Sequence, residues 1–291
     1  MQDRDAGQPE VVRVDPPVGR RAQLGMGGDQ RSDDALRELV VAARLEPGAE
    51  PIPGAVDAIR QLRAAGERVV FLTNNSSASL GDYVAKLEGL GISADARDVL
   101  TSAQSAARLL EPGTTALVCA GPGVDEALRA RRVATVRDGR ADAVVVGWHT
   151  DFDYSRLTAA FRAVHAGARL IGTNDDATYP TPDGLLPGGG SILAAVATAA
   201  GVVPEIAGKP YAPMAALVRE RVVHDEAQSD GAGRSVLVGD RVSTDGLMAA
   251  RLHLPFALVL TGVTTAADLP VTPAPAFVAD DLATLVRQLS T

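Results

Sequence analysis

The sequence has few of the residues that mark several functional classes. Its single cysteine, Cys119, cannot form an intramolecular disulfide. Aromatic residues make up 3% of the 291 residues, too few to suggest stacking on bases. No apolar run reaches the roughly 18 residues that span a bilayer. The start, Met1 to Asp5, lacks the basic region and apolar stretch of a signal peptide. These absences predict a cytoplasmic protein.

The charge balance narrows the range of partners. The formal net charge is −8 and the isoelectric point is about 5.1. Nucleic acids and anionic membranes attract basic surfaces, so neither is an expected partner. His165, His224 and His253 show no metal-ligand spacing with Cys119 or with one another. His149 follows Trp148 directly after an apolar run, where a ligand contact and a packing role both stay open.

Apolar runs alternate with helical periodicity from about residue 36 onward. Val56, Ile59 and Leu62 mark one helical face, and an uninterrupted apolar strand follows over 68–72. Strands that alternate with helices form parallel βαβ units, so the sequence predicts an α/β fold. Residues 1–35, rich in Gly, Pro, Asp and Arg, are predicted to form a disordered tail. Further strand-like runs lie at 115–119, 143–146, 169–172, 235–238 and 256–260.

Polar residues stand at equivalent places after these strands. Thr73 and Asn74 follow the 68–72 strand, and Asp240 follows the 235–238 strand, with Asp245 five residues later. Lys209 stands alone before a predicted helix. Ligands of open α/β sheets bind at the carboxyl ends of the strands, and these groups suit a phosphate and a hard cation. Helix capping and an ordinary surface lysine are the plain alternatives. The joint order of the signals favours a phosphate site.

Six segments in a fixed order suggest a family, and together they span about four fifths of the chain. They are EPIPGA at 50–55, FLTNNS at 71–76, TNDDATYP at 173–180, GLLPGGGS at 184–191, GKP at 208–210 and GDRVSTD at 239–245. On these segments the chain resembles the haloacid dehalogenase (HAD) superfamily, in particular its class IIA or NagD-type phosphatases. The resemblance implies a Rossmann-like core with a parallel sheet, and an α/β cap inserted into it.

The resemblance also implies boundaries and roles. The core is expected at 36–79 and 204–291, and the cap at 80–203. Thr73 and Asn74 would bind the phosphoryl group, and Lys209 would neutralise it. Asp240 would hold Mg²⁺ with support from Asp245. A Thr-Asn-x-Asp element of the cap, which corresponds to Thr173, Asn174 and Asp176, would contact the substrate; a tight turn is its structural alternative.

One motif of the family is missing. The family's nucleophile and general acid form an Asp-x-Asp-Gly motif upstream of the 50–55 segment. Counting back from that segment places the two aspartates on Val40 and Ala42. Alkyl side chains can neither attack phosphorus nor transfer a proton. Because the first aspartate also ligates magnesium, Mg²⁺ binding by Asp240 and Asp245 is expected to be weak or lost.

Other acidic residues are poor substitutes for the missing nucleophile. Asp15 lies 25 residues too early and precedes two prolines. Asp33 and Asp34 precede the apolar segment 36–41, so they would lie at the wrong end of its strand. Glu46, six residues after Val40, would reach the site only if the loop folds back.

Three functional hypotheses follow. The first is a catalytically impaired HAD-type protein that still binds a small phosphorylated metabolite. The second is an active, magnesium-dependent phosphatase of small esters such as phosphoglycolate or glycerol phosphate, with an unorthodox nucleophile or a misread gene upstream of residue 50. The third is an interaction module that forms homo-oligomers through its cap. The lack of a carboxylate at residue 40 favours the first.

Overall fold

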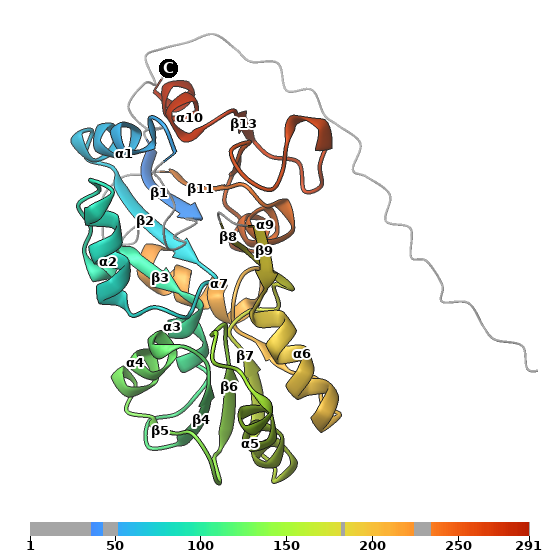
Figure 1. Ribbon diagram of the computed structural model, residues 1–291. Helices are drawn as coiled ribbons and strands as arrows, with labels where there is room; N and C mark the ends of the chain where they lie inside the picture. The colour runs from blue at the N-terminus through green and yellow to red at the C-terminus, as the bar shows by residue number, and fades with distance from the viewer. Residues whose placement is uncertain (1–35, 43–51, 182–183, 224–233, 291) are drawn as a thin grey trace, which may run out of the picture. The chain divides into compact units, whose positions relative to one another are not determined.

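The computed structural model of the protein describes residues 36–42, 52–181, 184–223 and 234–290 (Figure 1). The predicted tail at 1–35 and the candidate residues Asp15, Asp33, Asp34 and Glu46 lie outside the described residues. No helix in the described ranges is long and apolar enough to cross a membrane.

Six parallel strands form the core sheet. Their order is β13-β12-β11-β1-β2-β3, with β1 and β11 at the centre. This arrangement confirms the α/β fold class, and the predicted strands at 68–72, 235–238 and 256–260 are all present. The strands span Leu36–Ala42 (β1), Arg68–Thr73 (β2), Val99–Thr101 (β3), Arg234–Gly239 (β11), Phe256–Val259 (β12) and Phe277–Ala279 (β13).

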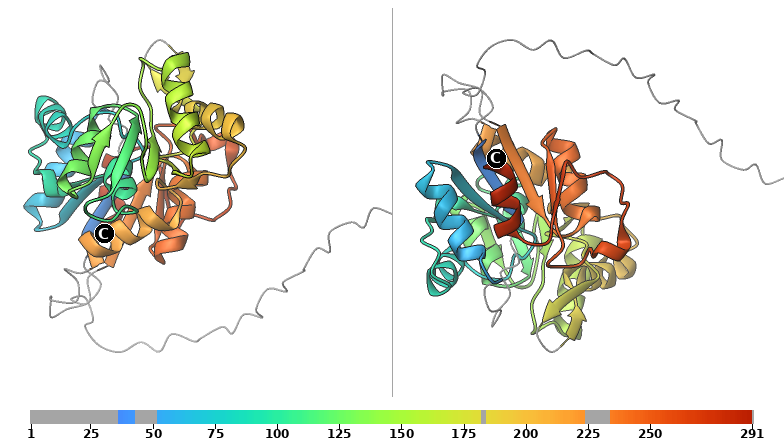
Figure 2. Two further views of the ribbon diagram at one scale, coloured as in Figure 1. Left: turned by 90° about the horizontal axis from the view of Figure 1, so that it is seen from below. Right: turned by 90° about the horizontal axis from the view of Figure 1, so that it is seen from above.

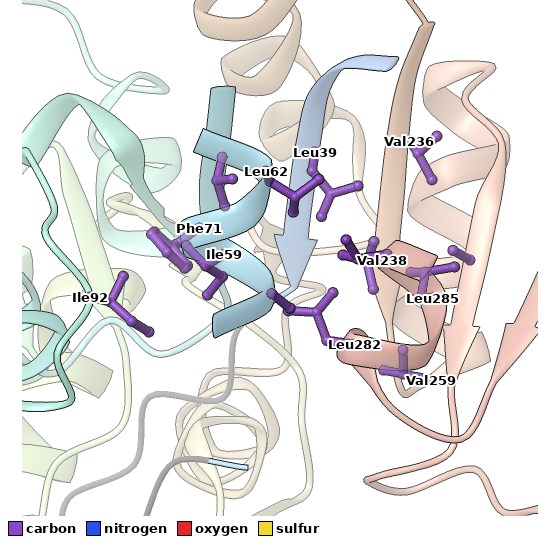
Figure 3. Packing of buried hydrophobic residues seen from close by; sticks show 14 of the residues in the cluster. Leu39, Ile59, Leu62, Phe71, Ile92, Val236, Val238, Val259, Leu282 and Leu285 are labelled. Carbon is purple, nitrogen blue, oxygen red and sulfur yellow. The ribbon is translucent and has the colours of Figure 1, made fainter. Parts of the chain in front are cut away.

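Helices cover both faces of the core sheet. On one face, α1 (Ala55–Ala64), α2 (Leu80–Gly89) and α10 (Leu282–Leu289) pack on Leu39, Phe71 and Val238 (Figure 3). Figure 2 (right) shows α1 and α10 side by side there. On the other face, α7 (Ala212–Val218) and α9 (Leu247–Leu252) pack on the alternate residues Val40, Val70 and Leu237. Because successive strand residues point to opposite faces, the continuous apolar runs fill both layers.

A second parallel sheet, called the cap sheet, lies largely within the segment predicted to form the cap. Its order is β10-β7-β6-β4-β5, and the strands span Thr115–Cys119 (β4), Ala134–Val136 (β5), Ala143–Val146 (β6), Arg169–Gly172 (β7) and Glu205–Ile206 (β10). Helices α3 (Ser102–Ala107) and α4 (Pro122–Ala130) cover one face. Helices α5 (Tyr154–His165) and α6 (Gly189–Ala200) lie side by side on the other (Figure 2, left).

Strand pairing links segments on either side of the predicted boundaries near residues 80 and 203. Strand β3 pairs with β2, and α2 buries Tyr83 and Leu87 in the same hydrophobic cluster as Leu39 and Phe71. Strand β10 pairs with β7, so the cap sheet extends to Ile206. The division of the chain into a core at 36–79 and 204–291 and a cap at 80–203 stays a prediction.

The remaining elements are short. An antiparallel hairpin joins β8 (Thr178–Thr181) and β9 (Gly184–Pro187) beside α6. Short helical turns span Ala96–Asp98, Arg219–Val223, Val242–Gly246 and Ala266–Asp268.

Candidate active site

Thr73 and Asp240, two predicted site residues of the core, lie at the carboxyl edge of its sheet. Thr73 is the last residue of β2 and is 4% exposed, and Asp240 directly follows β11 and is 8% exposed. Lys209 follows the cap sheet and precedes α7, where the chain returns to the core. This is the edge predicted from the sequence, because polar side chains at the ends of parallel strands come together there.

Two hydrogen bonds of the Asn74 side chain hold the loop that carries Lys209, called the lysine loop, against the end of β2. Its Oδ1 accepts a hydrogen bond from the Lys209 backbone N–H at 2.7 Å, and its Nδ2 donates to the Lys209 carbonyl at 3.2 Å. Gly208 precedes the lysine where a Cβ atom would lie 2.7 Å from Asn74 Oδ1, so the close approach requires glycine. The side chain expected to bind phosphate is thus engaged in positioning Lys209.

The charged groups of the core edge form a buried ion pair. Lys209 Nζ lies 2.8 Å from Asp245 Oδ1, and the two side chains are 8% and 3% exposed. Asp245 Oδ2 also accepts the backbone N–H of Arg241 at 3.1 Å. Asp240 Oδ2 accepts the N–H of Val263 at 2.6 Å. Both carboxylates therefore have protein donors, and Asp245 is the counter-ion of Lys209.

The Thr-Asn-x-Asp element of the cap contacts this edge. Asn174 Nδ2 donates to the Asn74 carbonyl at 2.9 Å, and Asn74 Nδ2 donates to Asp176 Oδ2 at 3.1 Å. Thr173 Oγ1 lies 2.9 Å from the buried Ser76 Oγ. The structure therefore brings Thr173, Asn174 and Asp176 to the core residues that the sequence grouped with them.

Two contacts between cap and core had no assigned role in the sequence. Arg241 Nη1 lies 3.2 Å from Asp176 Oδ1, and the Tyr211 hydroxyl donates to Asp175. The bond to Asp175 is the main cause that raises the pKa of Tyr211 to about 12. Arg241 could have been suspected from its place next to Asp240, whereas nothing in the sequence pairs Tyr211 with Asp175.

The strand register places Val40 inside the sheet. Val40 is fully buried and pairs with Val70 and Leu237. Thr73 and Asp240 each follow those partners by three residues, which is about 10 Å along a strand. Ala42 pairs with Leu72, one residue before Thr73. The assignment of Val40 and Ala42 to the nucleophile and acid positions therefore stays a prediction from residue counting.

The described residues do not complete a magnesium site. No three His, Cys, Asp or Glu side chains among them group closely enough to hold a metal ion. Magnesium requires near-octahedral oxygen ligation, and Asp245 is committed to Lys209.

A parallel core with a threonine, a lysine and two aspartates at its carboxyl edge, and an inserted α/β cap, defines a Rossmann-like fold of the HAD hydrolase type. Family models agree with this class: a haloacid dehalogenase-like hydrolase model matches residues 43–133, and a HAD-hydrolase-like model matches 206–285. The chain belongs to the haloacid dehalogenase-like hydrolase family, and its relatives support the class IIA branch. The first match begins at residue 43, after Val40 and Ala42.

Curated relatives are phosphatases. The chain is 41% identical over 227 residues to the D-glycerol 3-phosphate phosphatase of Mycobacterium tuberculosis, covering 76% of this chain and 61% of that protein. It therefore spans about three fifths of that relative's length. It is 32% identical to the acid sugar phosphatase of Staphylococcus saprophyticus, covering 83% of this chain and 93% of the relative.

Solved structures share the fold. The glycerol phosphate phosphatase of Mycobacterium tuberculosis in complex with calcium superposes with a TM-score of 0.76 at 36% identity, covering 85% of this chain and 74% of that one. The same phosphatase is also known in complex with magnesium. A hypothetical protein from Pyrococcus horikoshii superposes with a TM-score of 0.77 at 31% identity, covering 87% and 100%.

Proposed function

We propose that this protein binds the phosphate group of a small phosphorylated metabolite at the carboxyl edge of its core sheet, and that it has lost most of the hydrolytic activity of its family. The observation that carries the proposal is the lack of a carboxylate at the end of β1. Counting from the 50–55 segment gives Val40 and Ala42. The next residue, Ala43, lies outside the described residues and has no carboxylate either. Whether the nucleophile position is taken as residue 40 or as residue 43, the side chain there has no carboxylate.

The residues that remain support phosphate binding. Lys209 is 6% exposed, and a lysine in a poorly hydrated site attracts a phosphate oxygen more strongly than one in water. The loss of two carboxylates also removes negative charges that would repel the phosphate. Binding would then need little magnesium, and we propose that Mg²⁺ affinity is weak or lost, since Asp245 pairs with Lys209.

The proposed loss of activity is tested by measuring the rate of phosphate ester hydrolysis. The protein is assayed with 4-nitrophenyl phosphate, glycerol 3-phosphate and phosphoglycolate in the presence of magnesium. Loss of a covalent nucleophile lowers turnover by about 10⁴- to 10⁶-fold. From a median enzyme turnover of about 10 per second, we expect a rate at or below about 10⁻³ per second. Turnover near one per second that disappears in Lys209→Met and Asp240→Asn would overturn the proposal.

Thermal shift tests phosphate binding separately. A ligand at 100 times its dissociation constant stabilises the native state by about 2.7 kcal/mol, so millimolar phosphate should raise the melting temperature. The shift should persist when EDTA removes magnesium, and it should be absent from Lys209→Met. Lys86→Met on α2 is the matched control, because it removes a lysine elsewhere in the core. An equal shift in wild type and Lys209→Met would mean that phosphate binds elsewhere.

An active phosphatase of small esters is the second candidate function. The 41% identity to a D-glycerol 3-phosphate phosphatase favours it. A carboxylate from the segment 43–51 would then replace the missing nucleophile, and Glu46 is the candidate. Under this hypothesis Glu46→Gln abolishes glycerol 3-phosphate hydrolysis while phosphate binding survives. Sequencing of the coding region upstream of residue 50 tests the same point, because a corrected frame with Asp-x-Asp-Gly would supply the nucleophile directly.

A further inference from the structure

Helix α3 carries two serines whose hydroxyls bond outside the helix. Ser102 and Ser105 are both fully buried. Ser102 Oγ donates to the Asn74 carbonyl at 2.6 Å, and Ser105 Oγ donates to the Ala207 carbonyl at 2.7 Å. A serine in a helix can instead face solvent or bond to a carbonyl of the preceding turn. The two acceptors are 28 and 102 positions away along the chain, so the bonds join α3 to distant segments.

Both acceptors flank residues of the proposed phosphate site. Asn74 follows Thr73 at the end of β2, and Ala207 lies two residues before Lys209, at the start of the lysine loop. The Asn74 side chain connects the two segments, because it bonds to both the backbone N–H and the carbonyl of Lys209. The Ala207 N–H donates to the Gly172 carbonyl of the cap sheet at 2.8 Å. The backbone is therefore anchored on both sides of the site, and α3 supplies one bond to each side.

The packing of α3 fits a support for both segments. The helix begins directly after β3 of the core sheet, and its alanines pack in one hydrophobic cluster with Ala207 and strand β4 of the cap sheet. These alanines are Ala103, Ala106 and Ala107. The helix also contacts α7, which follows the lysine loop. Because α3 packs on elements before and after the lysine loop, its serines act from a fixed base.

We propose, on the basis of the phosphate binding proposed above, that Ser102 and Ser105 are positioning residues of the phosphate site. Their hydroxyls fix the backbone from which Lys209 projects, and this preorganisation raises the affinity for phosphate. Lys209 Nζ is buried 2.8 Å from Asp245, so a shift of the loop separates the ammonium from its counter-ion and from a bound phosphate. A loop that is ordered before binding also loses less conformational freedom when the ligand binds. Neither serine contacts phosphate in this scheme.

The two serines should contribute unequally. The Asn74 carbonyl also accepts a hydrogen bond from Asn174 Nδ2 at 2.9 Å, so it keeps a donor when Ser102 is replaced. Among the residues that the structure describes, Ser105 is the one donor to the Ala207 carbonyl. Ser105→Ala therefore leaves a buried acceptor without a partner, which costs more than the loss of one of two bonds. We expect the phosphate dissociation constant to rise about tenfold in Ser105→Ala and about threefold or less in Ser102→Ala.

Calorimetry with inorganic phosphate in magnesium-free buffer measures the affinity. Ser105→Cys keeps the size of the side chain but donates only weakly, so its dissociation constant should rise as well, whereas a packing role alone would leave it at the wild-type value. Ile59→Val in α1 is the matched control, because it lowers stability in the hydrophobic cluster on the other face of the core sheet from α7 and should bind phosphate like the wild type. Lys209-dependent binding in the wild type with equal affinity in both Ser105 variants would refute the positioning role.

Amide hydrogen exchange measured by NMR tests the positioning without a ligand. The Lys209 N–H donates to Asn74 Oδ1, and the Leu237 N–H of the core sheet donates to the Pro255 carbonyl. In both Ser105 variants we expect exchange at Lys209 to accelerate on the order of tenfold relative to exchange at Leu237, because the loop opens locally. Unchanged relative exchange would overturn the positioning role by itself. A wild type that does not bind phosphate would instead refute the proposed function, and the effect on affinity with it.

Discussion

Substituting Val40 by aspartate tests whether this residue lies at the carboxyl edge of the sheet, as residue counting implies, or in the buried core, as the strand register places it. If residue counting alone is followed, Val40→Asp with Ala42→Asp rebuilds the nucleophile motif, and the protein gains magnesium binding and some hydrolysis. The strand register places Val40 in the core instead, fully buried between Val70 and Leu237 and under the helices α7 and α9. We therefore expect loss of stability and no gain of activity.

The magnitude follows from the charge. An aspartate in this aliphatic layer has no donor for its carboxylate, so it folds in the protonated form and its pKa rises. Protonation of a group with an unfolded pKa of about 3.9 costs about 4 kcal/mol at pH 7 and about 1.5 kcal/mol at pH 5. Because the folded pKa is raised, the destabilisation is absent below the unfolded pKa and grows as the pH rises above it.

Val40→Asn is the matched control, because it has the same shape and no charge. Denaturant unfolding, followed by circular dichroism at pH 5 and at pH 7, measures the difference in unfolding free energy between Val40→Asp and Val40→Asn at each pH. Val40→Asp should be less stable than Val40→Asn by about 1.5 kcal/mol at pH 5 and about 4 kcal/mol at pH 7. A difference below about 1 kcal/mol at pH 7, or a melting temperature that millimolar magnesium raises in Val40→Asp, would place residue 40 at the sheet edge and refute the register.

Three further predictions concern the edge of the core sheet and the cap. The bond to Asp175 raises the pKa of Tyr211 from 10.0 to about 12, so the wild type should lose stability as the pH rises from 10 to 12, and Tyr211→Phe should lose less in pH-dependent unfolding. Asp176→Asn removes the partly exposed ion pair with Arg241 and should cost about 1 kcal/mol in denaturant unfolding, decreasing with added salt. Gly239→Ala places a methyl group on the carboxylate of the buried ion pair, so it should lower the unfolding free energy by about 1–3 kcal/mol and abolish any phosphate-induced thermal shift.

The fold could be read from the sequence because its signals are local. The apolar runs at 68–72, 115–119, 143–146, 169–172 and 235–238 are continuous, and strands that are buried on both faces require that pattern. The short strands β3 and β10 carried no such run. Their sheet membership depends on backbone pairing with β2 and β7, which has no local pattern in the sequence.

The sequence by itself determined which chemical groups the candidate site has: a threonine, a lysine and two aspartates after strands, and no carboxylate at the end of β1. Only the tertiary structure decided how they are used. It pairs Lys209 with Asp245 and directs the Asn74 amide to the lysine loop. It also buries Val40 three residues below the edge. These contacts join residues that are 36 to more than a hundred positions apart, and their geometry is set by strand register and loop packing, which have no local pattern in the sequence.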